Sequence, residues 1–353
     1  MPTPEQKNTD RQMMRRALRL ARRGWGRTSP NPMVGALVLG RAGQIVGRGF
    51  HRQAGQPHAE INALREAGRQ ADGGTLYVTL EPCSTHGRTP PCTEAIARAG
   101  LRRLVVGTED PNPKHAGRGL AWLRERGLEV ESGIEEESCR RLNQAFFCWI
   151  REQRPFTILK LALTLDGRIA TVAGDSKWIT GEAARKRVQK LRQWCDAIMV
   201  GGETVRRDNP RLTVRTPPDW SPQPLPVIYS HNPDFSPDLN LFSNPRRPPL
   251  VVAPDSPAAW RQTMRELGAR QITALLLEGG GELAAAALQA GVVDLAMFFV
   301  APKILGGRNS RPAVGGADPT RLAEALQLSD MAVERVGCDL LITGTPPHVH
   351  RTD

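Results

Sequence analysis

Apolar residues recur along the first part of the chain at spacings that alternate between those of helices and those of strands. Residues 9–24 carry apolar side chains at helical spacing, with Thr9 as a candidate N-cap and Gly24 as a candidate end. The pattern further predicts helices over 58–67, 92–99 and 117–126, and strands over 34–39, 45–50, 75–80 and 104–107. Such alternation favours an α/β fold with helices packed over a sheet.

A second set of elements begins after a break in the pattern. Residues 135–151 are typical of one further helix, and Arg154-Pro155 interrupts it. The apolar runs that follow predict strands over 156–160, 197–200, 227–229, 250–253, 274–277 and 295–300, and the Pro-rich stretch 216–226 predicts a loop. We therefore expect two α/β domains, residues 1–152 and 153–353.

Composition and charge narrow the class of protein. With 353 residues, 40% apolar content and 24% charged content, the chain is typical of a globular protein of two domains. Its polar N-terminus lacks the apolar core of a signal peptide, no apolar run spans a bilayer, and six cysteines make no disulfide framework, so we expect a cytoplasmic enzyme. The net charge of +12 favours an anionic partner. Basic stretches with interleaved aromatics are absent, so we expect no nucleic-acid partner.

Three short strings carry the first candidate site: Pro57-His58-Ala59-Glu60, Glu81-Pro82-Cys83 and Pro90-Pro91-Cys92. One histidine and two cysteines can hold zinc and leave the fourth tetrahedral position open for a water molecule. A carboxylate such as Glu60 can move the proton of a zinc-activated water. His58 and Glu60 are two residues apart, so they can address one point only from the open first turn of a helix.

The spacing of the two cysteines distinguishes this site from that of the nucleic-acid deaminases. Their pattern places two residues between the cysteines. Here eight residues, 84–91, separate Cys83 from Cys92 and bring His86 and Arg88 near the metal. His51 reads as a strand-end histidine, because three zinc ligands are already present.

Longer strings carry a resemblance to a known family. Residues 28–35 (TSPNPMVG), 57–60 (PHAE) and 81–92 (EPCSTHGRTPPC), with Asp110-Pro111-Asn112-Pro113 and Gly117-Arg118-Gly119, resemble the deaminase domain of bifunctional riboflavin-biosynthesis deaminase/reductases. That resemblance implies a cytidine deaminase-like fold, one zinc ion on His58, Cys83 and Cys92, and Glu60 as proton shuttle. It also implies that Asn31 binds the substrate, whereas spacing alone favours a turn residue between two prolines.

The second half contains no Gly-x-Gly-x-x-Gly, but residues 275–283 (LLLEGGGEL) predict a strand, a glycine turn and a helix start. Such a turn can cradle a phosphate or can be an ordinary connection. Residues 160–170, 174–180 and 204–215 resemble the reductase domain of the same family, which has a dihydrofolate reductase-like fold and uses NADPH. The resemblance implies cofactor contacts by Ala162, Trp178, Thr204, Asp208, Gly280, Gly281, Glu282, Leu283, Ala284, Ala285 and Ala286. It implies substrate contacts by Ser176, Arg192, Leu212, Arg215 and Glu278.

The sequence thus favours an enzyme with two active sites that acts on a phosphorylated pyrimidine, first by zinc-dependent deamination and then by NADPH-dependent reduction of the ribosyl chain. Two alternatives stay open at this point: a tRNA or nucleotide deaminase fused to an unrelated binding domain, and a structural zinc module. Lys160, Asp166, His86 and Arg88 have no firm role. A homodimer is expected by analogy with reductases of this fold.

Overall fold

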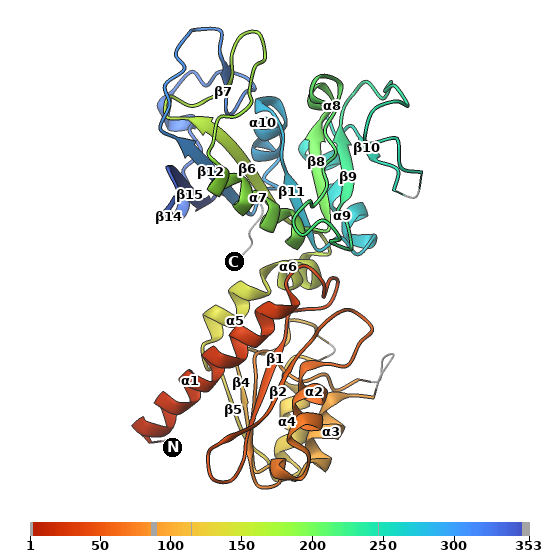
Figure 1. Ribbon diagram of the computed structural model, residues 1–353, viewed down its shortest axis with the longest axis vertical. Helices are drawn as coiled ribbons and strands as arrows, with labels where there is room; N and C mark the ends of the chain where they lie inside the picture. Colours follow the sequence, from red (N-terminus) through yellow and green to blue (C-terminus); the bar gives the residue numbers. More distant parts are fainter. Residues whose placement is uncertain (1–2, 86–89, 114, 246, 348–353) are drawn as a thin grey trace. The chain divides into compact units, whose positions relative to one another are not determined.

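The computed structural model describes residues 3–85, 90–113, 115–245 and 247–347. The chain forms two compact units, Met1–Glu152 and Gln153–Asp353, and Figure 1 shows the elements of each. Among the described residues, no helix combines the length and apolar character needed to cross a membrane.

The N-terminal unit is built on a five-stranded sheet of order β2-β1-β3-β4-β5. The strands are β1 (Gly35–Leu39), β2 (Ile45–Phe50), β3 (Thr75–Val78), β4 (Arg103–Val106) and β5 (Glu129–Ser132). β1 is antiparallel to both β2 and β3, whereas β3, β4 and β5 run parallel. Parallel strands end at one edge of a sheet, so the segments that follow β3 and β4 meet there.

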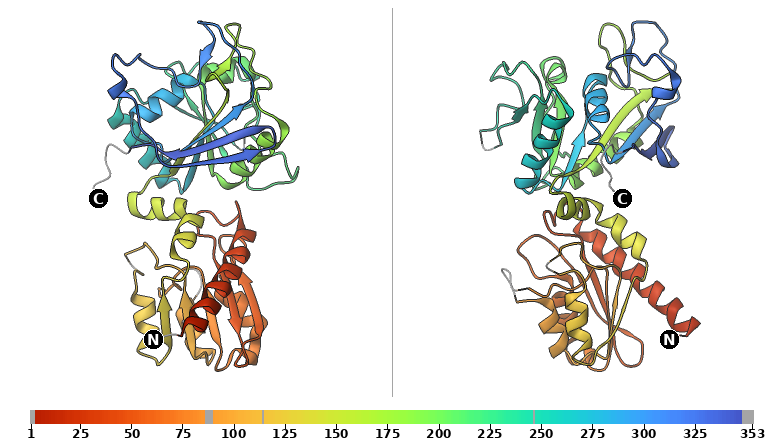
Figure 2. Two further views of the ribbon diagram at one scale, coloured as in Figure 1. Left: turned by 90° about the vertical axis from the view of Figure 1, so that its left-hand side faces the viewer. Right: turned by 180° about the vertical axis from the view of Figure 1, so that it is seen from behind.

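Helices cover both faces of this sheet, which gives three layers (Figures 1 and 2). α1 (Pro4–Ala21) and α5 (Glu136–Leu142) lie on one face, and α2 (Ala59–Ala67), α3 (Cys92–Arg98) and α4 (Arg118–Arg124) on the other. α6 (Gln144–Glu152) follows α5, and the short 3-10 helices η1 (Arg22–Gly24) and η2 (Gly68–Ala71) follow α1 and α2.

Two predicted helix boundaries are wrong. α1 begins at Pro4, and its N-cap is Thr3 in place of the predicted Thr9, because the Thr3 hydroxyl accepts a hydrogen bond from the Gln6 N–H at 3.2 Å. The predicted helix over 135–151 is two helices that are separated at Asn143. The Asn143 side chain is held by the backbone of Met33, with N–H to Oδ1 at 2.8 Å and Nδ2 to C=O at 2.9 Å.

Glycines let the α2 layer approach the sheet closely. A side chain at Gly49 of β2 would overlap the carbonyl oxygen of Ala59, the first residue of α2. A side chain at Gly47 would overlap the carbonyl of Ala63 one turn further along. Only glycine permits this contact, and it brings the first turn of α2 down onto the strand.

A buried ionic network joins α1 to the sheet. The Asp10 carboxylate accepts hydrogen bonds from both terminal nitrogens of Arg103, at 2.7 and 2.9 Å, and from the Tyr77 hydroxyl at 2.7 Å. Arg103 also pairs with Glu131. Burial opposes the charged form of Asp10, but the bonds from Arg103 and Tyr77 outweigh it and lower the pKa of that carboxyl.

The C-terminal unit contains an eight-stranded sheet of order β10-β9-β8-β11-β6-β12-β15-β14. The six strands from β10 to β12 run parallel, and β15 and β14 complete the sheet as an antiparallel edge. The strands are β6 (Phe156–Thr164), β8 (Ala197–Gly201), β9 (Leu225–Tyr229), β10 (Leu250–Val252), β11 (Ala274–Leu277), β12 (Leu295–Ala301), β14 (Ser329–Val336) and β15 (Asp339–Thr345). A separate two-stranded sheet pairs β7 (Arg168–Ala170) with β13 (Arg311–Pro312).

Helices again lie on both faces. α9 (Pro257–Ala269) and α10 (Gly281–Gln289) pack on one face, where Trp260, Met264 and Leu283 join a core built on β6, β8 and β11. α7 (Glu182–Trp194) lies on the opposite face, α8 (Gly202–Asp208) follows β8, and the 3-10 helix η3 (Leu322–Glu324) precedes β14 (Figures 1 and 2). The carboxyl ends of β6, β8, β9 and β11 therefore share one edge of the sheet, where α/β folds bind their ligands.

The network of Asp10 predicts a large, specific loss of stability on truncation. Asp10→Ala leaves the buried Arg103 without its main partner and is expected to lower the free energy of unfolding of the N-terminal unit by about 3 kcal/mol. Glu66→Ala removes the exposed Arg48–Glu66 pair, 3.2 Å apart, and is expected to lower it by less than about 1 kcal/mol. Native-state hydrogen exchange of the β3 and β4 amides in the full chain measures both losses. Equal losses in the two variants would contradict the role given to the network.

Candidate active sites

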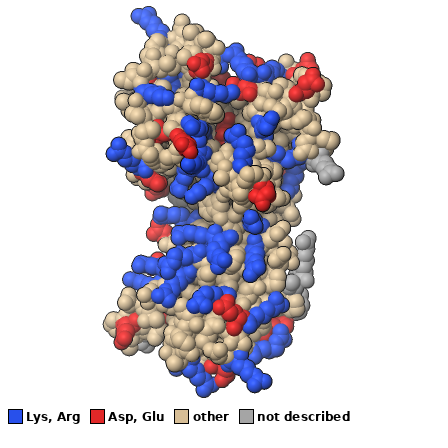
Figure 3. All heavy atoms as spheres, in the orientation of Figure 1, with Lys and Arg blue, Asp and Glu red and all other residues tan. Residues whose placement is uncertain are grey.

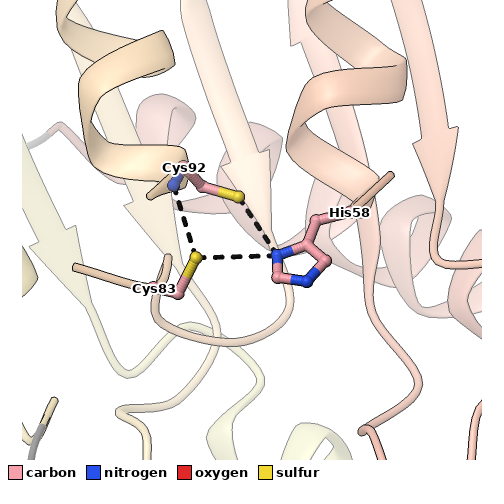
Figure 4. A group of neighbouring side chains, drawn as sticks. All are labelled: His58, Cys83 and Cys92. Atoms are coloured by element: carbon pink, nitrogen blue, oxygen red, sulfur yellow. Dashed lines mark hydrogen bonds between the residues drawn. The ribbon is translucent and has the colours of Figure 1, made fainter. Parts of the chain in front are cut away.

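Three candidate zinc ligands converge from separate elements of the N-terminal unit. His58 is the N-cap of α2, Cys92 is the first residue of α3, and Cys83 lies in the segment between β3 and α3. Figure 4 shows their side chains pointing toward one another. The ligand atoms of all three residues lie within 4.8 Å of one another. Two helix starts and one post-strand loop thus form a single cluster.

The geometry of this cluster fits a tetrahedral zinc ion. His58 Nδ1 lies 3.2 Å from Cys92 Sγ and 3.6 Å from Cys83 Sγ (Figure 4). Zinc bonds of about 2.3 Å to sulfur and about 2.0 Å to nitrogen require separations of about 3.5 Å between such ligands. His58 thus presents Nδ1 to the two sulfurs as its candidate donor atom. No fourth protein ligand belongs to the cluster among the described residues, as expected for a site that binds its reactant at the metal.

Electrostatics at the cluster favour a thiolate. Hydrogen bonds from Cys92 and His58 lower the pKa of the Cys83 thiol to about 4. The neighbouring Cys83 sulfur in turn raises the pKa of Cys92, together with burial, and the hydrogen bond to Cys83 raises the pKa of His58. The low pKa of Cys83 favours its thiolate even without a metal, and a bound zinc ion would favour the thiolate of Cys92 as well.

Glu60 lies in the first turn of α2 beside the cluster. Its side chain is buried, with 3% of the residue exposed, and it lines the same cavity as His58 and Cys83. Burial raises its pKa to about 7, against the opposing attraction of His58. A carboxyl group with a pKa near neutrality can both accept and return a proton, which is the property a general acid/base needs.

The cavity beside the cluster encloses about 220 Å³. Asn31 lines it and is held by His51, whose Nε2 lies 3.1 Å from Asn31 Nδ2. The other ring nitrogen of His51 lies 3.3 Å from the Pro57 carbonyl. His51 is not a member of the ligand cluster, but it lines the cavity, and this position was missed because nothing in the sequence pairs it with Asn31.

Another part of the cavity lining comes from the segment between β4 and α4. Asp110, Asn112 and His115 contribute to it, and the Glu81 carboxylate accepts hydrogen bonds from the backbone at both ends of this segment. In the sequence, Asp110 and Asn112 stand out only as part of a string, and no signal there assigns a role to Glu81 or His115. His86 and Arg88, which were expected near the metal, lie outside the described residues.

The C-terminal unit holds a larger cavity of about 820 Å³ at the carboxyl ends of its parallel strands. The expected cofactor-binding residues that line it are Ala162, Thr204, Asp208, Gly280, Gly281, Glu282 and Leu283. Ser176 and Glu278, expected at the substrate, line it as well. Among the described residues, four cations line it, Lys160, Arg206, Arg207 and Arg311, together with the carboxylates of Glu203, Asp208, Glu278 and Glu282. The arginines can bind phosphate groups of a ligand. Figure 3 shows Lys and Arg side chains, with Asp and Glu among them, on the face of this unit that is turned to the viewer.

The glycine turn before α10 fits a phosphate-bearing cofactor. A side chain at Gly279 would overlap Leu283, and one at Gly281 would lie 2.8 Å from the Pro312 carbonyl oxygen. Gly280 faces open space, since a Cβ added there would have no atom within 4 Å. Gly279 and Gly281 are thus required by packing, whereas Gly280 leaves room for a ligand at the N-terminus of α10.

Two charged residues of the cavity lining, Lys160 and Glu278, form an ionic group with Arg192. Arg192 donates to both oxygens of Glu278, at 2.7 and 2.8 Å, and to the Thr213 carbonyl at 3.2 Å. Burial opposes the charge on Glu278, but attraction by Arg192 and Lys160 keeps its pKa low. Burial lowers the pKa of Lys160 despite the attraction of Glu278. Arg192, expected to hold a phosphate, is therefore already paired with Glu278.

Several expected contacts do not line the cavity. Ala284 and Ala285 are buried in α10, Leu212 is buried in the segment that follows α8, and Arg215 is exposed. Trp178 is 63% exposed, with Arg185 over its ring and its carbonyl bonded to Lys303. Asp166 fixes a loop, accepting from the N–H groups of Leu305 and Gly306.

Comparison with protein families defines the class of the two domains. Residues 7–108 match the cytidine and deoxycytidylate deaminase zinc-binding region, and residues 155–342 match the RibD C-terminal domain. The chain therefore joins a zinc-binding deaminase domain to a reductase domain. The α/β class predicted from sequence for each half is confirmed.

Full-length relatives define the family. The chain is 44% identical to riboflavin biosynthesis protein RibD of Synechocystis, over 95% of this chain and 96% of that protein, and 38% identical to the Escherichia coli protein of the same name, over 94% and 98%. It is also similar to the solved structure of Acinetobacter baumannii RibD (TM-score 0.89, 37% identity, 97% and 99% covered). The chain belongs to this family of bifunctional deaminase/reductases of riboflavin biosynthesis.

The ligand cluster predicts stoichiometric zinc binding that depends on named cysteines. The full chain is expected to bind one zinc ion, and Cys92→Ala is expected to lower the affinity for it at least about tenfold, because a thiolate ligand is lost. Cys139→Ala removes a cysteine that is equally buried but lies in α5, and should leave zinc content unchanged. Metal analysis after dialysis against a weak chelator measures both. Full zinc retention by Cys92→Ala would show that the cluster is not the site.

Proposed function

We propose that the chain catalyses two successive reactions on one phosphorylated pyrimidine. In the first, the N-terminal domain hydrolytically removes an amino group from 2,5-diamino-6-(5-phosphoribosylamino)pyrimidin-4-one. In the second, the C-terminal domain reduces the ribosyl chain to ribityl with NADPH and yields 5-amino-6-(5-phosphoribitylamino)uracil. The observation that carries the proposal is the presence of both cavities on a chain whose full-length relatives include a diaminohydroxyphosphoribosylaminopyrimidine deaminase/5-amino-6-(5-phosphoribosylamino)uracil reductase from Thermotoga maritima (TM-score 0.86, 34% identity).

The residues of the first cavity fit a hydrolytic deamination. His58, Cys83 and Cys92 would hold zinc, which when bound lowers the pKa of a water molecule and polarises it for attack on the ring. Glu60 accepts the two protons of that water in turn, and it delivers one to the ring nitrogen and the other to the amino group that leaves as ammonia. Asn31, held by His51 at 3.1 Å, orients the pyrimidine.

The residues of the second cavity fit a hydride transfer to a sugar phosphate. NADPH, when bound, supplies the hydride, and the protein supplies alignment and phosphate contacts. Gly280 and the N-terminus of α10 would receive phosphate groups of the cofactor. Glu278, fixed by Arg192, and Lys160 form a charged end of the cavity that can bind sugar hydroxyls.

Different observations disfavour the two alternatives that the sequence leaves open. A nucleotide deaminase fused to an unrelated binding domain is disfavoured, because the second half matches the RibD C-terminal domain. A structural zinc module is disfavoured by the open coordination position, judged over the described residues, and by the buried Glu60 beside it. The cytoplasmic location stays a prediction.

A stepwise assay tests the proposed function. Zinc-loaded protein and the deaminase substrate should release ammonia, and later addition of NADPH should be followed by its oxidation. Glu60→Ala should lower ammonia release at least about 100-fold, because general acid/base catalysis contributes that much, while zinc content and reduction of the deaminated substrate stay unchanged. Ammonia release without NADPH oxidation would contradict the two-step proposal, and active Glu60→Ala would contradict the role of Glu60.

We also propose that the chain forms a homodimer through the antiparallel edge of the large sheet. β14 is the edge strand there, and its residues from Ser329 to Arg335 are exposed. The apolar side chains of Met331 and Val333 are 53% and 64% exposed. An exposed edge strand with apolar side chains is a surface that proteins normally cover.

A charged substitution on β14 tests this interface. Val333→Glu should convert the dimer to a monomer, because the interface would bury an unpaired carboxylate. Val172→Glu changes an equally exposed valine that lies in the loop after β7, and should leave the dimer intact. Light scattering after size-exclusion chromatography measures the mass of each. A monomeric wild type, or a dimeric Val333→Glu, would show that β14 is not the interface.

A further inference from the structure

Glu81 is a buried carboxylate that the proposed chemistry does not use. The residue is 4% exposed, and it follows β3 two positions before Cys83. Its Oε2 accepts hydrogen bonds from the backbone N–H groups of Asp110, at 3.2 Å, and Gly117, at 2.9 Å. Its Oε1 accepts one from the N–H of Gly119 at 3.1 Å. A carboxylate with three backbone donors is a strong, charge-assisted anchor.

The three donor N–H groups lie at the two ends of the segment between β4 and α4, which forms one wall of the cavity beside the zinc-ligand cluster. Asp110 lies shortly after the end of β4, and Gly117 and Gly119 lie at the start of α4. Between them, Asn112 and His115 line the cavity together with Asp110. Within the segment, the Asn112 N–H bonds Asp110 Oδ1 and the His115 N–H bonds the Asn112 carbonyl, both at 2.8 Å. The Glu81 side chain therefore binds the backbone at both ends of this wall.

Close packing at Gly119 also restricts movement of the start of α4. A side chain on Gly119 would lie 2.9 Å from the Pro82 carbonyl oxygen and 3.3 Å from Glu81 Oε1. Gly117 has a φ of 80°, which disfavours other residues. The start of α4 is thus pressed directly against the Glu81-Pro82 segment.

We infer that Glu81 is a positioning residue of the deaminase, which sets the distance between the wall formed by Asp110, Asn112 and His115 and the zinc ligands and so determines how tightly the pyrimidine binds. This inference rests on the proposed deaminase function of the cavity. Glutamate is required because a carboxylate offers only acceptors to the three N–H groups, whereas a glutamine amide turns a donor toward at least one of them. Aspartate is one methylene shorter and cannot reach both ends of the segment.

Glu81→Gln tests the inference with two readouts on the zinc-loaded full chain. KM for the deaminase substrate is expected to rise about tenfold with kcat changed less, since loss of a charge-assisted bond displaces the wall and leaves Glu60 in place. Amide exchange of the peptides that contain Gly117 and Gly119 is expected to quicken about tenfold without substrate. Zinc content and the reductase activity toward the deaminated substrate should match wild type. Glu66→Gln, on the exposed face of α2, is the matched control and should change none of these.

Gly119→Ala tests the contact between Glu81 and Gly119 by changing its other partner. It should raise KM in the same direction, and its effect should not add to that of Glu81→Gln, because both act on one contact. An unchanged KM with unchanged amide exchange in Glu81→Gln would overturn the inference, and so would a loss of zinc, which would place the effect at Cys83. If the wild type itself released no ammonia, the proposed function would fail. Unchanged amide exchange would then overturn the anchoring role by itself, and faster exchange would support it.

Discussion

The N-terminal site depends on one geometric constraint, that three ligand atoms from separate segments must lie within a tetrahedral zinc sphere. His58, Cys83 and Cys92 meet this constraint because α2 and α3 start at the same edge of the sheet. The glycines of β2 allow α2 to lie directly on the strand. Glu60 is then placed beside the candidate ligands by the first turn of the same helix, so one close contact between backbones positions both the proposed metal ligands and the proposed general acid/base.

The second site also lies at the edge of a sheet where parallel strands end. Parallel strands β6, β8, β9 and β11 end at one edge, and the turn after β11 carries Gly279 to Gly281. Tight packing accounts for the outer two glycines, and the open space at Gly280 provides the room a ligand needs. Cations and carboxylates both line the cavity of about 820 Å³ at this edge, so its lining offers donors for phosphate groups and acceptors for hydroxyl groups.

Local pattern predicted most elements of both sheets but not the contacts between distant segments. The strand over 45–50 is observed with those bounds, because alternation and turns are local signals. The break at Asn143 was missed because its cause is the backbone of Met33, 110 residues away. Pairing of His51 with Asn31, and of Arg192 with Glu278, likewise depends on tertiary placement. Motif spacing singled out the three residues that form the candidate metal cluster, but spacing carries no information on which arginine is already paired with a carboxylate.

Three glutamates, Glu60, Glu278 and Glu81, show how the surroundings of a carboxylate determine what it can do. Glu60 has no guanidinium partner in its cavity lining, as far as the described residues go, so burial dominates and its pKa rises to about 7, where proton exchange is easy. Glu278 is paired with Arg192 and attracted by Lys160, so it stays ionised and can serve only as an acceptor. Glu81 is surrounded by backbone N–H groups, which commit both oxygens to structure. The role expected of each carboxylate therefore follows from its surroundings, and Glu60, which lines a cavity and has a pKa near neutrality, is the one suited to exchange protons with a reactant.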